Sequence, residues 1–191
     1  MHKRSTVTNL ACFSQYIAES LDNNGQVDVI YTDFHKASDQ IDHNILLTKL
    51  EWFGFTSPLI ALFKSYLLNR EQCVRYRNFV SNPYIASSGV PQGSNLGPLL
   101  FLLYINDITD VISCNKLLFA GDLKIYVEIN SIEDSTVLQS DLDAVTCWCS
   151  TNALKLNNSK CHVMSFSHKL KTMIYPYRIG NTQLKKVSNI K

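Results

Sequence analysis

The sequence predicts an α+β fold, in which a mixed or antiparallel sheet has helices packed on one face. Segments with apolar residues at helical spacing alternate with short runs of β-branched and aromatic residues. One such run ends in an acid, Asp33, and a second acid, Asp122, lies in a tight turn between two others. At 191 residues, 46% of them hydrophobic and 18% charged, the chain has the size of one domain and is too apolar for disorder.

A helix, a strand and two further helices are predicted in the first part of the chain. The first helix is marked by apolar residues on one face, Leu10, Phe13, Ile17 and Leu21, and ends in the turn residues 22–25. Residues 27–32 (V-D-V-I-Y-T) follow as a strand. Ile45, Leu46 and Leu50 indicate a short helix that stops near Gly54. Ser57 as N-cap and Pro58 in the first turn then open a helix with the apolar stripe Leu59, Leu62, Phe63, Tyr66 and Leu67.

The rest of the chain is predicted to form two strands, a helix, a tight hairpin, a second helix and two further strands. Residues 72–88 are interpreted as two strands joined near positions 81–83, and apolar residues from Leu96 to Ile108 indicate a helix. Residues 117–119 and 123–127 flank Ala120-Gly121-Asp122 as a tight hairpin. Ser131 and Asp134 fit a capping box for a helix with the buried face Leu138, Leu142, Val145 and Trp148. Two strands, 161–166 and 173–179, complete the predicted sheet.

Asp33 and Asp122 are candidates for a metal site. Carboxylates at neighbouring strand ends suit Mg²⁺, which prefers oxygen ligands. Two such ions, about 3.5–4 Å apart, can stabilise the attacking and leaving oxygens of a phosphoryl transfer. Turns also attract aspartate for backbone reasons, so this pair alone is a weak signal.

Four longer strings give the pair its context, and together they cover nearly the whole chain. They are Y-T-D-F-H-K-A-S-D-Q-I-D-H at 31–43, S-G-V-P-Q-G-S-N-L-G-P-L-L-F at 88–101, L-F-A-G-D-L at 118–123, and W-C at 148–149 followed by L-K-L-N-N-S-K-C at 154–161. In order and spacing they resemble the palm motifs of reverse transcriptases of non-LTR (LINE-type, jockey-like) retrotransposons. The string at 88–101 is the most specific of them.

The resemblance implies a right-hand polymerase palm with partial fingers. It implies RNA-directed DNA synthesis by two-metal nucleotidyl transfer, with two Mg²⁺ ions, an RNA template, a DNA primer and dNTPs. Asp33 and Asp122 would bind metal, and Lys160 would lie near the triphosphate as a possible proton donor to pyrophosphate. The implied substrate-binding residues are Phe34, Ser38, Gln92 and Gly93. Glycine at position 93 also suits a close approach of the backbone to a ligand.

Two departures from the family pattern fall on this site. The family hairpin has two consecutive aspartates, whereas this chain has Gly121 before Asp122, so one metal-binding carboxylate is missing. The family also has an aromatic residue at position 38 that rejects the 2′-hydroxyl, and here it is Ser38. We therefore expect a catalytically impaired copy with poor discrimination between dNTPs and rNTPs.

The ends of the resemblance also suggest a fragment. Residues 3–10 resemble the tail of a fingers motif, and residues 183–191 reach the position of the primer-contacting hairpin. Residues 1–191 are thus interpreted as a reverse transcriptase domain fragment, partial fingers plus palm, without thumb or endonuclease. The alternatives are a non-catalytic RNA- or DNA-binding relic of a transposable element and a translated relic of marginal stability.

Composition limits the remaining function classes. A net charge of +2 is too small to indicate nucleic-acid binding by itself, so basic residues must be arranged locally. Arg70, Arg75 and Arg77, with Tyr76, resemble a basic strand with an aromatic residue that could contact a phosphate backbone. An ordinary solvated strand explains those arginines equally well. We expect no membrane span and no signal peptide, and hence an intracellular protein, nuclear or cytoplasmic. The six cysteines are expected as reduced thiols, with Cys12, Cys73 and Cys114 buried, and the group at 147–162 fits no ordinary zinc pattern.

Overall fold

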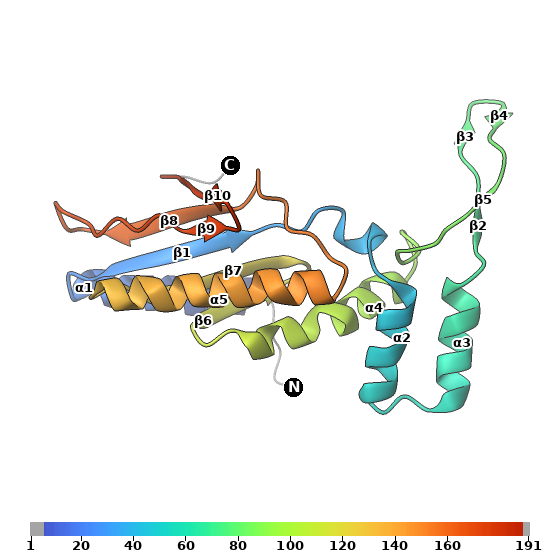
Figure 1. The fold of residues 1–191 in the computed structure, drawn as a ribbon, viewed down its shortest axis with the longest axis horizontal. Helices are drawn as coiled ribbons and strands as arrows, with labels where there is room; N and C mark the ends of the chain where they lie inside the picture. Colours follow the sequence, from blue (N-terminus) through green and yellow to red (C-terminus); the bar gives the residue numbers. More distant parts are fainter. Residues whose placement is uncertain (1–5, 189–191) are drawn as a thin grey trace. The chain divides into compact units, whose positions relative to one another are not determined.

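A five-stranded mixed sheet is the centre of the first of two units in the computed structural model, which describes residues 6–188 (Figure 1). The sheet has the order β11-β8-β1-β7-β6. Its strands are β1 (Gln26–Thr32), β6 (Asn115–Phe119), β7 (Asp122–Glu128), β8 (His162–Ser167) and β11 (Lys185–Lys186). All neighbours are antiparallel except β11 and β8, which are parallel. The predicted positions 3–5 and 189–191 lie outside the described residues.

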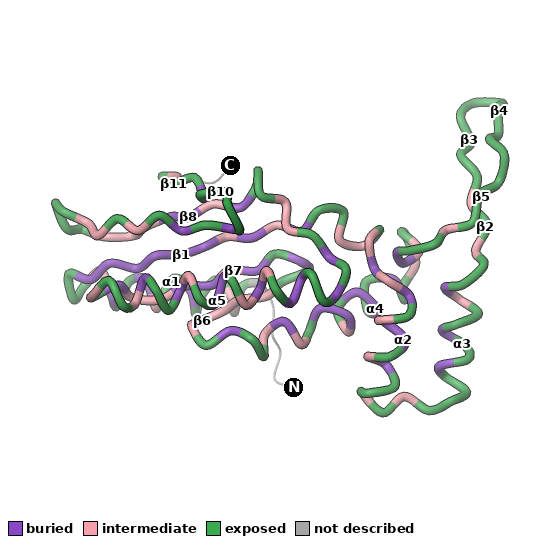
Figure 2. The backbone as a smooth tube through the Cα atoms, viewed as in Figure 1, coloured by how far each residue is buried: buried purple, intermediate pink, exposed green. Residues whose placement is uncertain are grey.

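Strand β1 is the most buried element because it has hydrogen-bonded neighbours on both edges and side chains packed on both faces. Val27, Val29 and Ile30 are fully buried, and Figure 2 shows most of β1 as buried chain. Its polar residues Gln26 and Asp28 are buried as well, and they are hydrogen-bonded to each other, with Gln26 Nε2 donating to Asp28 Oδ1 at 3.0 Å.

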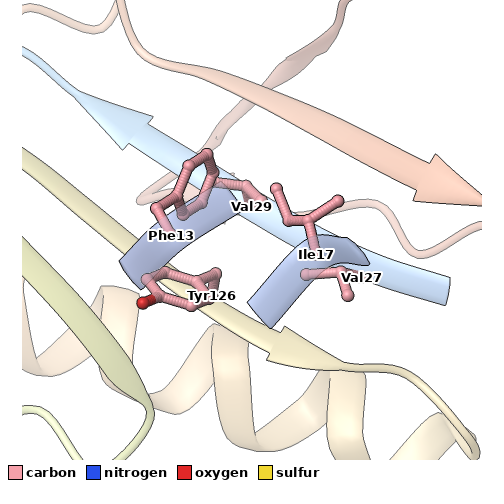
Figure 3. Close-up of a cluster of buried hydrophobic side chains, with 5 residues drawn as sticks. All are labelled: Phe13, Ile17, Val27, Val29 and Tyr126. Carbon is pink, nitrogen blue, oxygen red and sulfur yellow. The ribbon is translucent and has the colours of Figure 1, made fainter. Parts of the chain in front are cut away.

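Helix α1 (Thr6–Asp22) covers one face of this sheet. Phe13 and Ile17 pack against Val27, Val29 and Tyr126 in one buried cluster (Figure 3). The Phe13 ring meets the Tyr126 ring edge to face, with centroids 5.1 Å apart. Alternation along β1 places Val27 and Val29 on the same face, so α1 lies over that face.

Helix α5 (Ile132–Thr151) lies on the other side of the sheet. Asp28 points away from the Val27 and Val29 face, and its carboxylate accepts a hydrogen bond of 2.9 Å from the hydroxyl of buried Tyr177. Ser135 on α5 is the second polar neighbour of that hydroxyl. The α+β class and the mixed sheet are confirmed, but the expected placement of all helices on one face is wrong in detail, because α1 and α5 cover opposite faces.

The N-terminal end of α5 is fixed by an aspartate. The Asp134 carboxylate accepts hydrogen bonds from the backbone amides of Asn130 and Ser131, at 2.9 and 2.8 Å, which is the backward half of the predicted capping box. The predicted buried stripe, Leu138, Leu142, Val145 and Trp148, is buried. Of the predicted strand at 173–179 only β9 (Arg178–Ile179) forms, and it pairs with β10 (Thr182–Gln183).

The second unit comprises residues 35–106 and 151–154 and is mainly helical. Its helices are η1 (Ala37–Asp39), α2 (His43–Trp52), α3 (Ser57–Leu67) and α4 (Leu96–Ile105), and η2 (Asn106–Val111) follows α4. Asp42 caps α2 by accepting from the amides of Asn44 and Ile45. The N-cap of α3 is Thr56, one residue before the predicted Ser57, and it makes no side-chain cap hydrogen bond.

The buried face of α3 differs from the predicted stripe. Ile60, Phe63 and Leu67 are buried, whereas Leu59 and Leu62 are exposed. The predicted apolar residues and the buried residues both have helical spacing, and they lie on neighbouring faces of the helix. Periodicity alone therefore could not show which of the two faces is buried.

A β-ribbon follows α3 and is exposed along most of its length (Figures 1 and 2). Strand β2 (Glu71–Gln72) pairs with β5 (Tyr84–Ile85), and β3 (Arg75–Tyr76) pairs with β4 (Phe79–Val80). The chain turns at residues 77–78, where Arg77 has a φ of 55°, and not near 81–83 as predicted. Ser81 instead bridges the ribbon by bonding the amide of Val74 through its hydroxyl.

Candidate functional site

The register of the sheet brings Asp33 and Asp122 to facing positions. Tyr31 pairs with Lys124 and Thr32 with Leu123 in the antiparallel ladder between β1 and β7. The next position in this register places Asp33, which directly follows β1, opposite Asp122, which begins β7. Opposing residues in antiparallel strands have Cβ atoms about 4.5–5.5 Å apart. Two carboxylates that are distant in sequence therefore become neighbours at one edge.

The turn before Asp122 explains how the hairpin closes. Phe119 pairs with Asp122, so the loop is the two residues Ala120 and Gly121, with φ values of 48° and 101°. Positive φ at both positions is the requirement of a type I′ turn, which glycine meets without steric cost. Gly121 thus completes the turn geometrically while contributing no side-chain oxygen.

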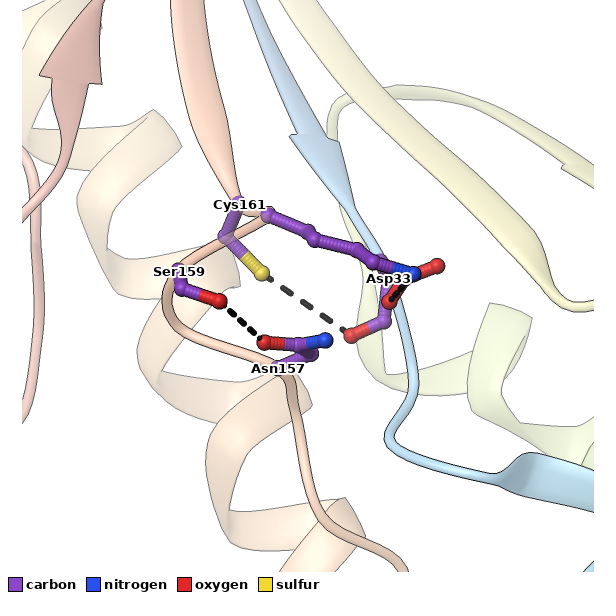
Figure 4. A network of polar contacts seen from close by, with 5 residues as sticks. Asp33, Asn157, Ser159 and Cys161 are labelled. Atoms are coloured by element: carbon purple, nitrogen blue, oxygen red, sulfur yellow. Dashed lines mark hydrogen bonds and ion pairs between the residues drawn. The ribbon is translucent and has the colours of Figure 1, made fainter.

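Lys160 is held beside Asp33 by the turn that leads into β8. The carbonyl of Asp33 accepts the amide of Asn157 at 2.7 Å and faces the thiol of Cys161, with sulfur 3.9 Å away (Figure 4). The amides of Lys160 and Cys161 both bond the carbonyl of Asn157 and close the turn. Burial raises the pKa of the Cys161 thiol, which keeps it protonated as a donor at neutral pH.

The electrostatics of Asp33 leave room for a cation. Its Oδ2 is buried and accepts no hydrogen bond from any described residue, and Lys160 Nζ lies 3.4 Å from it as an ion pair. The Lys160 side chain is 65% exposed and that of Asp33 30% exposed, so this pair is open to solvent on one side. A carboxylate oxygen with unused acceptor capacity, facing a second carboxylate, is a suitable ligand for a divalent cation.

One cavity of about 740 Å³ contains three of the predicted residues. It is lined by Asp33, Asp122 and Lys160, together with Tyr31, Thr32, Leu123, Lys124, His162 and Met164. No third carboxylate, cysteine or histidine joins the two aspartates in a metal-binding cluster anywhere within residues 6–188. Asp33 and Asp122 are the two carboxylates of this cavity that could hold a divalent cation, and Gly121 adds no side-chain oxygen to them.

Phe34, the fourth predicted residue of this unit, is turned into the core. Its side chain is 6% exposed, and its backbone forms an isolated bridge with Leu156. The side chain of Phe34 therefore packs in the core, and Phe34 is not among the residues that line the cavity.

The other predicted residues, Ser38, Gln92 and Gly93, belong to the second unit. Gln92 Nε2 donates to Asp39 Oδ1 at 2.8 Å, and the Ser38 carbonyl accepts the amide of Val90. Gly93 has a φ of 76° and open space where a Cβ would point. A polar cavity of about 660 Å³ is lined by Asp39 and Gln92 together with Arg70 and Tyr84.

Sequence reasoning missed Lys124, Tyr31 and His162, which line the cavity of the aspartates. The alternation of side chains along a strand could have indicated Tyr31 and Lys124. Tyr31 lies two residues before Asp33, Lys124 lies two residues after Asp122, and residues two apart on a strand share a face. The identity of the neighbouring strand β8, which contributes His162 opposite Tyr31, was not readable from the chain.

The exposure of three cysteines and the composition of the helices can be compared with two further expectations from the sequence. Cys12 and Cys73 are exposed and Cys114 is half-buried, so the expected burial of these three is wrong. Within the described part of the chain, no helix is both long and apolar enough to cross a membrane.

Known proteins resemble this chain in sequence along most of its length. The family model described as reverse transcriptase (RNA-dependent DNA polymerase) matches residues 1–186. A probable RNA-directed DNA polymerase from transposon BS of Drosophila melanogaster is 30% identical over 82% of this chain and 18% of the relative. The RNA-directed DNA polymerase from the mobile element jockey of the same fly is 28% identical over 81% of the chain and 18% of the relative. The chain thus spans less than a fifth of the length of these two relatives.

Solved structures resemble it in fold. An apo telomerase from Candida tropicalis gives a TM-score of 0.64 at 12% identity, covering 88% of this chain and 37% of the telomerase chain. Telomerase from Candida albicans, in complex with a fragment of telomeric RNA, gives 0.64 at 13% identity over 91% and 31%. These likenesses confirm the right-hand polymerase fold. Since the family model spans nearly the whole chain and the relatives are transposon polymerases, the chain belongs to the reverse transcriptase (RNA-dependent DNA polymerase) family, as a domain of the non-LTR retrotransposon type.

Proposed function

We propose that this chain carries the palm, with part of the fingers, of a non-LTR retrotransposon polymerase, and that its Asp33 and Asp122 site is a weakened form of a two-metal nucleotidyl-transfer centre. The observation that carries the proposal is the facing pair of carboxylates, one of which has a buried oxygen without a hydrogen bond. In the proposed reaction, a primer 3′-hydroxyl attacks the α-phosphate of a dNTP selected by an RNA template, and pyrophosphate leaves.

Each residue of the site would have its own role in this reaction. Asp33 and Asp122 would hold Mg²⁺, which when bound neutralises phosphate charge and activates the attacking hydroxyl. Lys160, which is largely exposed beside Asp33, would meet the triphosphate and supply a proton to the leaving pyrophosphate oxygen. Gln92 and Gly93 would contact nucleotide and template, and the Phe34 backbone would lie near the triphosphate.

Gly121 accounts for the proposed impairment. Replacing a carboxylate by a hydrogen atom removes one negative charge from a site that must balance two divalent cations. Metal ions supply several kcal/mol of charge stabilisation in such transfers. We expect the loss of one ligand to lower the rate by about 10³-fold, which corresponds to about 4 kcal/mol.

Primer extension on an RNA template with Mg²⁺ tests this proposal. Gly121→Asp is compared with the unaltered chain and with Gly121→Asn, which makes the same turn without the charge. A φ of 101° strains any side chain, so the turn must relax toward the left-handed region that Asp and Asn tolerate, and the two variants share that cost. We expect synthesis from Gly121→Asp alone, and its loss again in Gly121→Asp with Asp33→Asn. Equal synthesis by the unaltered chain would refute the impairment.

Ser38 carries a second, independent part of the proposal. An aromatic ring at this position would exclude the 2′-hydroxyl of an rNTP by its bulk, whereas a serine leaves that space open. In the Gly121→Asp background, Ser38→Phe is expected to raise the preference for dNTP over rNTP by at least tenfold in single-nucleotide incorporation. Ser38→Ala is the matched control and should leave the preference unchanged.

Nucleic-acid binding without synthesis is the second candidate function, and the β-ribbon favours it. Tyr76 and Phe79 pair across the ribbon and are 68% and 78% exposed, which is the arrangement of a stacking platform for bases. Arg77 lies over the Tyr76 ring at 5.4 Å, and Arg75 is its basic neighbour on the same strand. Binding that survives removal of Mg²⁺ and depends on this ribbon would support this function over polymerisation.

A further inference from the structure

Lys124 places a positive charge on the same face of the sheet as the two aspartates. It lies two residues after Asp122 on β7, and its cross-strand partner Tyr31 lies two residues before Asp33. Residues two apart on a strand share a face and are separated by about 7 Å. The row Asp33–Asp122 is therefore followed, one step along the same face, by the row Tyr31–Lys124.

Two aromatic rings hold the Lys124 ammonium in this position. Its Nζ lies 5.2 Å from the centroid of Phe13 and 5.1 Å from that of Tyr31. Phe13 is itself buried in the cluster that fixes α1 to the sheet. No carboxylate of the described residues forms an ion pair with Lys124, so its charge is stabilised by ring faces and is not neutralised by a neighbour.

The formal charge of the cavity is consequently zero. Asp33 and Asp122 contribute two negative charges, and Lys124 and Lys160 contribute two positive charges. The Lys160 ammonium can move away from the aspartates, because its side chain is largely exposed and its ion pair with Asp33 is open to solvent. The Lys124 ammonium is less free to move away, because its side chain is half-buried and lies over the rings of Phe13 and Tyr31.

We propose that Lys124 is a specificity-determining residue of this cavity, which acts as a fixed monovalent cation and lowers its affinity for divalent cations. The inference rests on the proposed metal role of Asp33 and Asp122. If the row spacing of about 7 Å is taken as the charge separation, repulsion between a dication at the aspartates and the ammonium, at a dielectric constant between those of protein surface and water, corresponds to about a tenfold weaker affinity. Restoring the carboxylate at position 121 then repairs only part of the site.

Mn²⁺ binding, measured by the electron paramagnetic resonance signal of free Mn²⁺, tests this without requiring activity. The background is Gly121→Asp, in which binding is strongest. Lys124→Met should tighten Mn²⁺ binding about tenfold, whereas Lys124→Arg, which keeps the charge and the ring contacts, should leave it unchanged. Lys169→Met is the control, because it removes the same charge far from the aspartates. Lys169 follows Ser167, which pairs with Gln26 at the opposite end of β1 from Asp33. This variant should change the affinity for Mn²⁺ less than twofold.

The outcomes separate the two proposals. If Asp33→Asn abolishes Mn²⁺ binding but Lys124→Met does not strengthen it, the inference about Lys124 is wrong and the metal site stands. An equal gain from Lys124→Met and Lys169→Met also contradicts it, since only net charge would then matter. If Asp33→Asn has no effect, or no variant binds Mn²⁺, the metal role and the inference fail together. Unfolding curves of each variant identify any loss of affinity caused by misfolding of the α1 contact.

Discussion

At the scale of single residues, Asp141 is the most heavily bonded carboxylate of the first unit. It is 5% exposed and accepts the amides of Ser113 and Cys114, the latter at 2.7 Å, and the Ser113 hydroxyl. Burial alone would raise its pKa, but the hydrogen bonds from Cys114 and Ser113 outweigh it and hold the pKa below the ordinary value of 3.8. Asp141 therefore ties α5 to the segment before β6 in its charged form.

We expect Asp141→Asn to lower the free energy of unfolding at pH 7 by about 1.5–3 kcal/mol, because hydrogen bonds to a charged acceptor are lost. Since the folded pKa is lowered, this stabilisation is complete above about pH 5 and disappears as the pH falls through the folded pKa. Urea unfolding at pH 7 and at pH 3 should show the difference between variant and parent shrinking at the lower pH. Exposed Asp143 on the same helix gives the control Asp143→Asn, with a change within about 0.5 kcal/mol. A constant difference at both pH values would contradict the assignment.

The cysteines give a second residue-scale prediction, because their pKa values and exposure divide them into two groups. Burial, reinforced by Asp141, raises the pKa of Cys114 to about 12, and burial raises that of Cys149 to about 12. Only the thiolate is nucleophilic. Mass spectrometry after brief iodoacetamide treatment at pH 8 should find label on the exposed Cys12, Cys73 and Cys147, and at least tenfold less on Cys114, Cys149 and Cys161. Uniform labelling of all six cysteines in the native protein would contradict this division.

At the scale of elements, the hairpin β6–β7 is strained at one residue of its turn. Ala120 has a φ of 48°, a conformation that costs free energy for alanine and little for asparagine or glycine. Ala120→Asn creates Asn-Gly, the favoured pair of a type I′ turn. We expect a gain of about 0.5–1 kcal/mol, or roughly 1–4 °C in Tm for a chain of this size. Exposed Ala11, inside α1, is the control, since Ala11→Asn should lower Tm through helix propensity.

At the scale of the whole molecule, a net charge of +2 means that any affinity for nucleic acid comes from local clusters. The ribbon is the strongest candidate, with Arg75 and Arg77 beside exposed aromatic rings. Removing two phosphate contacts to a single strand should reduce the slope of log affinity against log salt by about 1.4. We expect this for Arg75→Ala with Arg77→Ala in fluorescence anisotropy with single-stranded RNA.

Two further variants separate charge from stacking in the same measurement. Lys169→Ala with Lys171→Ala removes equal charge from the first unit and should leave the slope unchanged. Tyr76→Ser with Phe79→Ser should weaken binding by about 1–3 kcal/mol per stacked base at every salt concentration, with no change in slope. Equal effects of the two basic pairs would mean that the affinity is non-specific.

The sequence by itself determined the family, the order of the elements and the two aspartates, because each depends on local patterns. The helix over Thr6–Asp22, strand β1 and the hairpin around residues 120–121 follow from residue spacing and turn chemistry within a dozen positions. The departure at Gly121 is equally local and is visible without any structure. Local pattern did not predict the structure correctly in two places. On α3, two apolar faces have the same helical spacing, and at 173–177 the chain forms no strand although its residues favour one.

Only the tertiary structure decided which residues meet. The opposition of Asp33 and Asp122 and the placement of Lys124 between Phe13 and Tyr31 depend on strand register and on which face α1 covers. A shift of register by one residue would send Lys124 to the opposite face without altering a single local preference. Such contacts between segments distant in the chain are fixed by burial of the whole apolar face, and that is a property of the folded sheet and helices together.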